Sequence, residues 1–370
     1  MKNRTFLSLC ACALAILTAC GEKDVPDIDP ASAVTVQITK SMADSIWSEK
    51  LPDAFVDVES EYVPQDSTTE LYYKDFYENW IDEHIEETRD VIFTFDGDTV
   101  TYTFEDDKKK KNQKLVKITT DGAHVTIHND SLVIVGTDTI ASGRARMNYI
   151  LTGESDNGSL RIYSNKKFLI TLDQIKLTNQ RGAAINIQKS FDKKRAFIRI
   201  ADYTDNTLCD AAVYTDTVPG EDDKACLFSE GKLIFFGEKI GNGKLTVTGN
   251  HAHGIASDSR IYIHKGVTIV VDSAAKDAIH CDALVMGGGS VTSFGQKDGV
   301  QCDEEHAGIL QKGGRLLTAA KRAFTAPTGF TYEGGEFCGV GNETASPNTS
   351  SSVSTWMQTN YTGYKVVYSY

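Results

Sequence analysis

The sequence is short of positive charge. Lys and Arg number 38 against 51 Asp and Glu, which gives a formal net charge of −13 at pH 7. Removing residues 1–19 would delete Lys2 and Arg4 but no acidic residue, and the net charge would become −15. Nucleic-acid binding needs a basic surface that neutralises phosphates, so this balance argues against such a partner. Binding an acidic sugar would require a cation as a bridge.

The cysteines lack the spacing of a metal site. The cysteines that follow Cys20 are Cys209, Cys226, Cys281, Cys302 and Cys338. An odd number excludes a complete set of disulfides within the chain. No Cys-x-x-Cys spacing occurs and no histidine cluster accompanies these residues, which argues against a zinc site. We therefore expect them to be small buried residues.

A long apolar run occurs only near the N-terminus. Residues 6–17 are mostly apolar, follow two basic residues and lead into Thr18-Ala19-Cys20. This pattern is typical of a bacterial lipoprotein signal, in which the cysteine is lipidated and becomes the mature N-terminus. No later run approaches the roughly 18 apolar residues of a membrane helix. We predict a signal peptide at 1–19, lipidation of Cys20 and an acidic linker at 20–34.

The chain contains an internal repeat of 21 to 25 residues, seen in Gly243–Gly266, Gly266–Gly289 and Gly289–Gly314. Each unit has a glycine, an alternating apolar strand, a polar corner, an acidic residue and a second short strand. Such strands without helical periodicity indicate a β solenoid, and the period is too short for a propeller blade. The sequence predicts an all-β fold, a right-handed parallel β-helix (solenoid) over 119–340.

The flanking regions differ in composition from the repeats. We predict a partly β N-terminal cap at 35–118 that covers the open edge of the first repeat, because solenoids need capping for solubility. Residues 341–370 form a tail with one last strand, "YKVVYSY". Aromatic side chains in the cap could stack on sugar rings, although packing is the more common use; they are Tyr72, Tyr73, Tyr77 and Trp80.

Alignment of the repeats stacks acidic residues in rows. One row holds His253, Asp277 and Asp298; the other holds Glu230, Asp258, Asp282 and Asp303. Like charges at the strand spacing of about 4.8 Å repel by roughly 1 kcal/mol in water, so the carboxylates splay into solvent, take up a proton or share a cation. Oxygen ligands suit calcium better than zinc. The candidate calcium ligands are Asp277, Asp282, Asp298 and Asp303, with Glu304, Glu305 and His306 beside them.

Cys281 and Cys302 also align with each other, in a row that contains Ser229 and Ser257. A stacked ladder of small residues inside the repeat is the expected arrangement. A disulfide between neighbouring repeats is the alternative that spacing allows, although strand neighbours often have unsuitable Cβ directions.

Several ordered motifs carry a family resemblance. They are "YYKDFYEN", "GSLRIYSNKKFLITLDQIKLTNQRGAAINIQ", "LFSEGKLIFFG", "VTGNHAHGIASDSRIYIHKG" and "KDGVQCDEE". Over roughly residues 72–340 the chain resembles carbohydrate-binding domain-containing proteins with a pectate-lyase-like right-handed β-helix, whose lipoprotein members are common in Bacteroidetes. The resemblance implies a non-catalytic protein that binds calcium and a plant-type polysaccharide, either acidic or cellulose. The family's Asp-Gly-Ile corner is kept as Asp298-Gly299-Val300 but altered at Asp277-Ala278-Ile279 and His253-Gly254-Ile255.

The leading hypothesis is therefore a polysaccharide-binding lipoprotein of the outer membrane, displayed on the cell surface. Glu22 and Asp24 after the lipidated cysteine resemble, in part, an acidic surface-export signal. A polysaccharide lyase is one alternative, but the Arg-x-Pro-x-x-Arg pattern is absent. A polygalacturonase-like hydrolase is another, with Asp222-Asp223 as an acidic pair, but the Asn-Thr-Asp motif is missing. A structural adhesin that binds a protein partner is the fourth.

Overall fold

In the part of the chain that it describes, the computed structural model is all-β apart from one helix. The residues that it describes are 38–51, 55, 88–104, 116–129, 132–135, 138–141, 146–188, 195–303, 308–327, 329–344, 356–361 and 364–369. The predicted signal peptide (1–19), Cys20, the linker (20–34) and the aromatic side chains at 72–80 lie outside these residues and stay predictions.

The described residues form one helix followed by a succession of strands. The first are α1 (Lys40–Lys50), β1 (Thr88–Asp96), β2 (Thr99–Phe104), β3 (Lys117–Asp121), β4 (His124–Asn129), β5 (Leu132–Val135), β6 (Asp138–Ala141), β7 (Arg146–Ser155), β8 (Ser159–Ser164) and β9 (Phe168–Thr178). The next are β10 (Ile185–Gln188), β11 (Arg195–Ile200), β12 (Asp205–Cys209), β13 (Ala225–Ser229), β14 (Lys232–Gly237), β15 (Gly243–Gly249), β16 (His253–Ile263), β17 (Val267–Ala274) and β18 (Ile279–Met286). The last are β19 (Ser290–Phe294), β20 (Asp298–Cys302), β21 (Ile309–Gln311), β22 (Arg315–Thr325), β23 (Phe330–Tyr332), β24 (Glu336–Thr344), β25 (Trp356–Tyr361) and β26 (Tyr364–Ser369).

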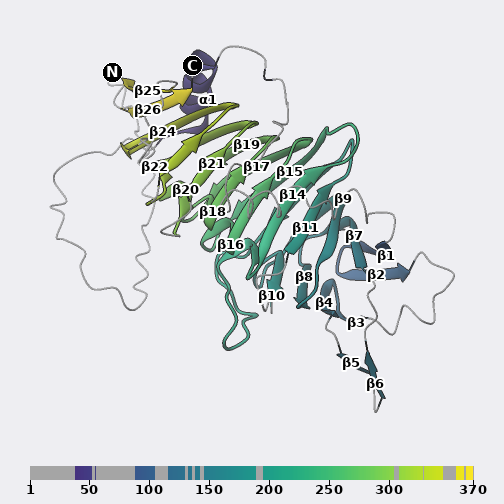
Figure 1. Ribbon diagram of the computed structural model, residues 1–370. Coiled ribbons are helices and arrows are strands. Elements are labelled where there is room, and N and C mark those ends of the chain that lie inside the picture. Colours follow the sequence, from purple (N-terminus) through teal and green to yellow (C-terminus); the bar gives the residue numbers. More distant parts are fainter. Residues whose placement is uncertain are drawn as a thin grey trace, which may run out of the picture. The chain divides into compact units, whose positions relative to one another are not determined.

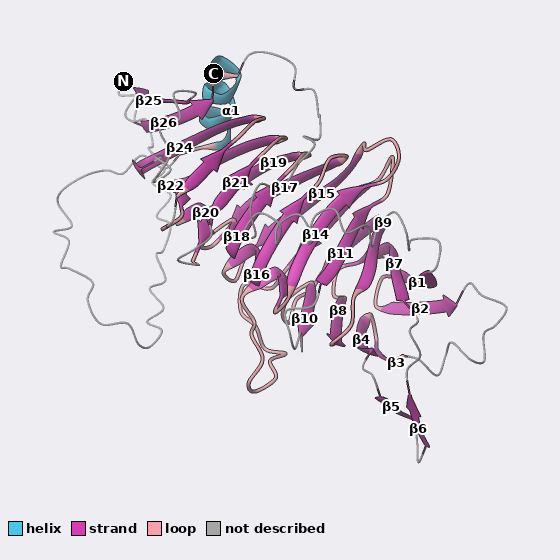
Figure 2. Cartoon of the chain, viewed as in Figure 1, coloured by secondary structure: helices cyan, strands magenta, loops and turns pink. Residues whose placement is uncertain are grey.

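Most strands pair in parallel with a strand one repeat away, and these pairs form three ladders (Figures 1 and 2). The first ladder runs through β4, β8, β10, β13, β16, β18, β20 and β22. The second runs through β7, β9, β11, β14, β16, β18, β21 and β23. The third runs through β9, β12, β15, β17, β19, β22 and β24. Long strands such as β16 take part in two ladders.

The strand register confirms the alignment of the repeats. Ile255 pairs with Ile279, and Ile279 pairs with Val300. Residues that lie 24 and 21 positions apart in the sequence are therefore direct neighbours in space. The mostly parallel strand arrangement agrees with the predicted all-β class.

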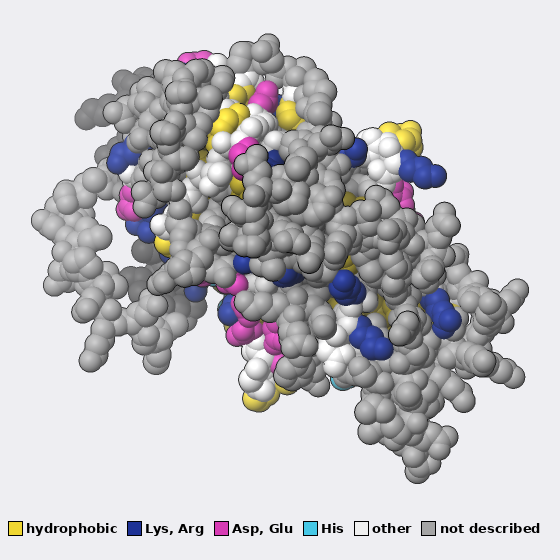
Figure 3. Space-filling view, viewed as in Figure 1, with side chains coloured by type: hydrophobic (Ala, Val, Ile, Leu, Met, Phe, Trp, Pro, Cys, Tyr) yellow, Lys and Arg dark blue, Asp and Glu magenta, His cyan; other side chains and the backbone are white. Residues whose placement is uncertain are grey.

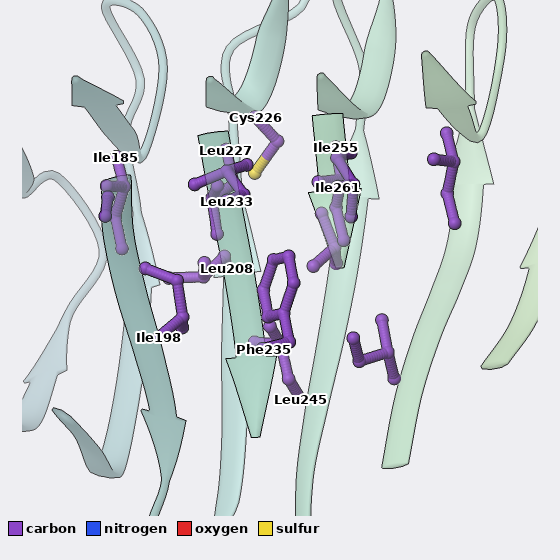
Figure 4. Packing of buried hydrophobic residues seen from close by; sticks show 14 of the residues in the cluster. Ile185, Ile198, Leu208, Cys226, Leu227, Leu233, Phe235, Leu245, Ile255 and Ile261 are labelled. Atoms are coloured by element: carbon purple, nitrogen blue, oxygen red, sulfur yellow. The ribbon is translucent and has the colours of Figure 1, made fainter. Parts of the chain in front are cut away.

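The core lies between the three ladders and is filled by stacked rows of aliphatic side chains. Ile185, Leu227 and Ile255 occupy equivalent positions on β10, β13 and β16 and are almost completely buried. Figure 4 shows these side chains pointing toward the same interior as Phe235 of β14 and Leu245 of β15. Burying each such side chain contributes about 1.5–3 kcal/mol to folding, so the repeat is stabilised mainly by contacts between successive units.

A second, smaller apolar cluster lies on the opposite face of the second ladder. Its members stack in register on neighbouring strands; the buried ones are Leu169, Phe197, Ile234, Phe236, Tyr262 and Val285. On β14, for example, Leu233 and Phe235 belong to the main core, whereas Ile234 and Phe236 belong to this cluster. Strands that are buried on both faces read as continuous apolar runs, which explains the sequence "LIFF".

The region predicted to cap the first repeat divides between the two ends of the ladders. The hairpin of β1 and β2 does extend the second ladder, because β1 pairs in parallel with β7. Helix α1, however, packs against the last strands rather than the first repeat: Trp47 lies with its ring 5.3 Å from that of Phe294, in a cluster that includes Val340 of β24. The expectation that the whole region 35–118 covers the first repeat is therefore wrong for this helix.

The C-terminal strand is confirmed, and a partner strand was missed. β26 pairs antiparallel with both β24 and β25. This antiparallel pairing covers the backbone groups of β24 in place of another parallel strand. Among the described residues, no helix has the length and hydropathy needed to cross a membrane.

Candidate functional site

The corner that leads into β16, β18 and β20 stacks one polar residue from each repeat. The N–H of Gly254 donates to the carbonyl of Asp277 at 3.2 Å, and the N–H of Ala278 donates to the carbonyl of Asp298 at 2.9 Å. The predicted row of His253, Asp277 and Asp298 is therefore confirmed. The parallel register carries each corner directly over the next one, so polar side chains of successive repeats meet.

Two histidines converge on Asp277, whose side chain is fully buried. Nδ1 of His253 lies 3.2 Å and Nδ1 of His280 lies 3.1 Å from the same oxygen, Oδ2. The two imidazole rings lie beside each other, with centroids 4.4 Å apart. Among the described residues, these three side chains form a cluster whose candidate ligand atoms all lie within 4.8 Å of one another.

The cluster reaches the surface through Asp303. Nε2 of His280 lies 2.9 Å from Oδ2 of Asp303, whose side chain is half exposed. Oδ1 of Asp277 accepts a hydrogen bond of 3.2 Å from the N–H of Asp298. A continuous path of carboxylate, imidazole and carboxylate thus runs from the buried Asp277 to solvent.

The electrostatics keep Asp277 ionised despite its burial. Burial disfavours the carboxylate, but the imidazoles of His253 and His280 beside it outweigh burial and hold the pKa of Asp277 well below its usual range. Burial also lowers the pKa of His253, which favours a neutral imidazole with one ring nitrogen free to act as an acceptor or ligand.

Asp298, the next residue in the row, is neutralised in another way. Its two carboxylate oxygens accept hydrogen bonds of 2.6 Å from Nε and Nη2 of Arg322, and Oδ1 accepts a third of 2.7 Å from Thr325. Such a bidentate pair is among the strongest hydrogen-bonded arrangements available to a carboxylate. Asp298 is completely buried, and Arg322 on the neighbouring strand β22 compensates its charge.

The region that carries these corners also carries the family match. A family model for carbohydrate-binding domain-containing proteins matches residues 136–363, which include most of the three ladders and the whole histidine–aspartate cluster. The chain belongs to this family. A solved polysaccharide lyase-like protein from C. thermocellum, studied as a gadolinium derivative, is 19% identical; the match covers 67% of this chain and 93% of that chain, with a TM-score of 0.45. None of the curated proteins matches the sequence significantly.

In this carbohydrate-binding domain, the four predicted calcium ligands do not come together as one site. Asp298 gives both oxygens to Arg322, and Asp277 faces two imidazoles. Asp303 contacts His280 and accepts a hydrogen bond from Gln301. Calcium takes six to eight oxygen ligands, so this arrangement does not fit a single calcium site built from all four residues. The neighbouring positions 304–306 lie outside the described residues, and Asp282 is partly buried on β18, outside the cluster.

The second predicted row of acids is interrupted. The register between β16 and β18 shifts between Ser257 and Arg260, where Asp258 and Asp282 lie. Because of this irregularity, neither acid is part of a regular backbone pair of that ladder. Lys224 instead donates to Asp258 at 2.8 Å.

The domain carries further acids in the loop between β12 and β13. Figure 3 shows acidic side chains gathered near this loop, which hangs below β16 in Figure 1. Asp222 pairs with Lys224 at 3.0 Å, and Asp223 accepts a hydrogen bond from Asn186 at 3.1 Å. Burial raises the pKa of Asp223. The acidic pair considered for hydrolysis is therefore held by a lysine and an amide.

The prediction of small buried cysteines is confirmed for Cys226, Cys281, Cys302 and Cys338, whereas Cys209 is partly exposed. Cys281 and Cys302 pair directly in the ladder, with sulfurs 4.0 Å apart, and the cysteines of the described residues are free. Burial raises the pKa of Cys338 to about 12.

Sequence reasoning found His253 and Asp277 in one row but missed His280. The available signal was the alternation of β18, on which His280 and Asp282 face away from the core while Cys281 faces inward. Together with the corner position of Asp277, this alternation turns His280 toward the same side.

Proposed function

We propose that this protein binds polysaccharide without cleaving it. The observation that carries the proposal is the carbohydrate-binding family model, which matches 136–363. The ligand class is a long plant-type polymer, either acidic and pectin-like or cellulose.

The proposed architecture is a right-handed parallel β-helix solenoid. Its support is the in-register parallel pairing in three ladders, with one short strand per repeat in each. Stacked repeats present equivalent side chains at regular intervals of about 4.8 Å. A surface of that kind suits an extended chain molecule better than a compact ligand.

The proposed location is the outer membrane, with the lipidated Cys20 as anchor and the domain on the cell surface. The sequence pattern before Cys20 supports it. A surface-anchored protein meets polymers that are too large to enter the cell.

Calcium binding stays a prediction, and its proposed role is to bridge this acidic protein and an acidic polysaccharide. The chain has a formal charge of −13, so a cation would reduce its repulsion from an acidic sugar. Its ligands would have to differ from the quartet, because Asp298 is committed to Arg322.

Two arginines at the C-terminal end of the ladders are paired with acids, which supports binding over catalysis at these positions. A lyase needs a free strong base, usually arginine, yet Arg315 lies 3.0 Å from Glu336 and Arg322 is bound to Asp298. Lys224 likewise neutralises Asp222. These groups are committed to structural ion pairs.

A glycan array with the full chain tests the proposal. We expect retention on one class of plant polysaccharide, and a calcium bridge would make retention on acidic polymers sensitive to a chelator. Equal retention with and without chelator would remove calcium from the proposal, and an array without any bound polysaccharide would contradict the proposed function.

A further inference from the structure

The histidine–aspartate cluster brings two imidazoles and two carboxylates into contact. His280 lies between two carboxylates, with Nδ1 3.1 Å from Asp277 and Nε2 2.9 Å from Asp303. Both ring nitrogens of His280 therefore face carboxylate oxygens, and a ring nitrogen that carries no proton there directs its lone pair at an oxygen lone pair. Uncompensated contacts of this kind are costly away from water.

His253 adds a second unmatched nitrogen to the same place. Its Nδ1 lies 3.2 Å from Oδ2 of Asp277, yet it is buried and has no hydrogen bond of adequate geometry. His253 is only 8% exposed, so water does not reach the atom freely. A cation between the three side chains would give this nitrogen a partner and would contact the other two ligand atoms as well.

We propose that His253, Asp277 and His280 bind a divalent transition-metal ion, with Zn²⁺ as the favoured ion. Two imidazoles and one carboxylate form a donor set for zinc, copper, iron or nickel, whereas calcium takes oxygen ligands. The ligand atoms lie 3.1 and 3.2 Å from Asp277 Oδ2, and bonds to zinc of about 2.0–2.2 Å fit between atoms at such separations.

The surroundings provide what such a site requires. Asp303 accepts from Nε2 of His280, which leaves Nδ1 as the ligand and orients the ring, as carboxylates do around metal-bound histidines. The side chain of His280 is 20% exposed, which gives the ion a path from solvent and leaves room for water to complete the coordination. The carboxylates of Asp277 and Asp303 balance the two charges of the ion.

The proposed site accounts for the histidine that stands in the row of corner residues where the next two repeats have aspartates. His253 occupies the position that Asp277 and Asp298 occupy in the next repeats, and Asp298 is closed off by Arg322. The argument from oxygen ligands that pointed to calcium therefore does not apply at this corner. The proposal is independent of sugar binding.

Calorimetric titration of the full chain, without a histidine tag and after chelator treatment, tests the site with ZnCl₂ as the probe. We expect one Zn²⁺ per chain, loss of measurable binding in His280→Gln, and a ten- to hundredfold weaker affinity in Asp303→Asn. His251→Gln is the matched control, because His251 is exposed and contacts Tyr214 and Ala212 instead of the cluster.

Thermal unfolding shows whether each variant is folded and, separately, whether Zn²⁺ stabilises it. Zn²⁺ is expected to raise the Tm of the wild type and of His251→Gln but not that of His280→Gln, and Ca²⁺ is expected to raise none through this site. Absence of zinc binding by the wild type, or equal zinc binding by His280→Gln and His251→Gln, would overturn the proposal.

Discussion

At the scale of single residues, two neighbouring basic side chains form ion pairs that differ in their burial. Lys321 and Arg322 are adjacent, and each pairs with an acid. The Lys321–Glu343 pair is about half exposed on both sides, whereas Asp298 beneath Arg322 is completely buried. Exposed pairs contribute about 0–1 kcal/mol, but removing one partner of a buried pair leaves an uncompensated charge.

Arg322→Ala is expected to lower the free energy of unfolding by about 3–5 kcal/mol, because Asp298 would lose its bidentate partner. Lys321→Ala serves as the matched control and is expected to change it by less than about 1 kcal/mol. Denaturant unfolding of both variants measures the difference. Similar small losses in the two variants would show that Asp298 does not depend on the arginine.

At the scale of elements, helix α1 packs against the last strands, among them β22, β24 and β26. Thr39 caps the helix by accepting from the N–H of Met42, and Ala43, Ile46 and Trp47 face the strands. These residues make only about one turn of apolar spacing, which is too short a pattern to predict a helix from sequence. The strands were predictable because the repeat supplies the same alternation several times.

Trp47→Ala is expected to cost about 3–5 kcal/mol in stability, since the buried indole would leave a cavity against Phe294. The control on the same helix is Glu49→Ala, an exposed position that should change stability by about 0.5 kcal/mol or less. Thermal unfolding compares the two. Equal Tm values would mean that the docking of α1 contributes nothing to the stability of the ladders.

At the scale of the whole molecule, the sequence predicted the ladders and part of the corner, but not the cluster. The period brings His253 over Asp277, so their meeting was predictable. Arg322 lies 24 residues after Asp298 and pairs with it in the ladder of β20 and β22, so the period also brings these two residues together. The contact of His280 with Asp277 depends on the direction of the His280 side chain after the corner, and the bidentate contact of Arg322 depends on the conformation of its side chain. Neither follows from the repeat period, which specifies backbone register only.

The central claim is that the molecule holds a polysaccharide and does not cut it. The most direct measurement titrates the full chain with polygalacturonate and, separately, with soluble cellulose oligomers, following binding heat and product release in the same samples. We predict saturable binding to one of these polymers with no new reducing ends and no unsaturated product. Absence of binding to both, or release of either product, would contradict the account.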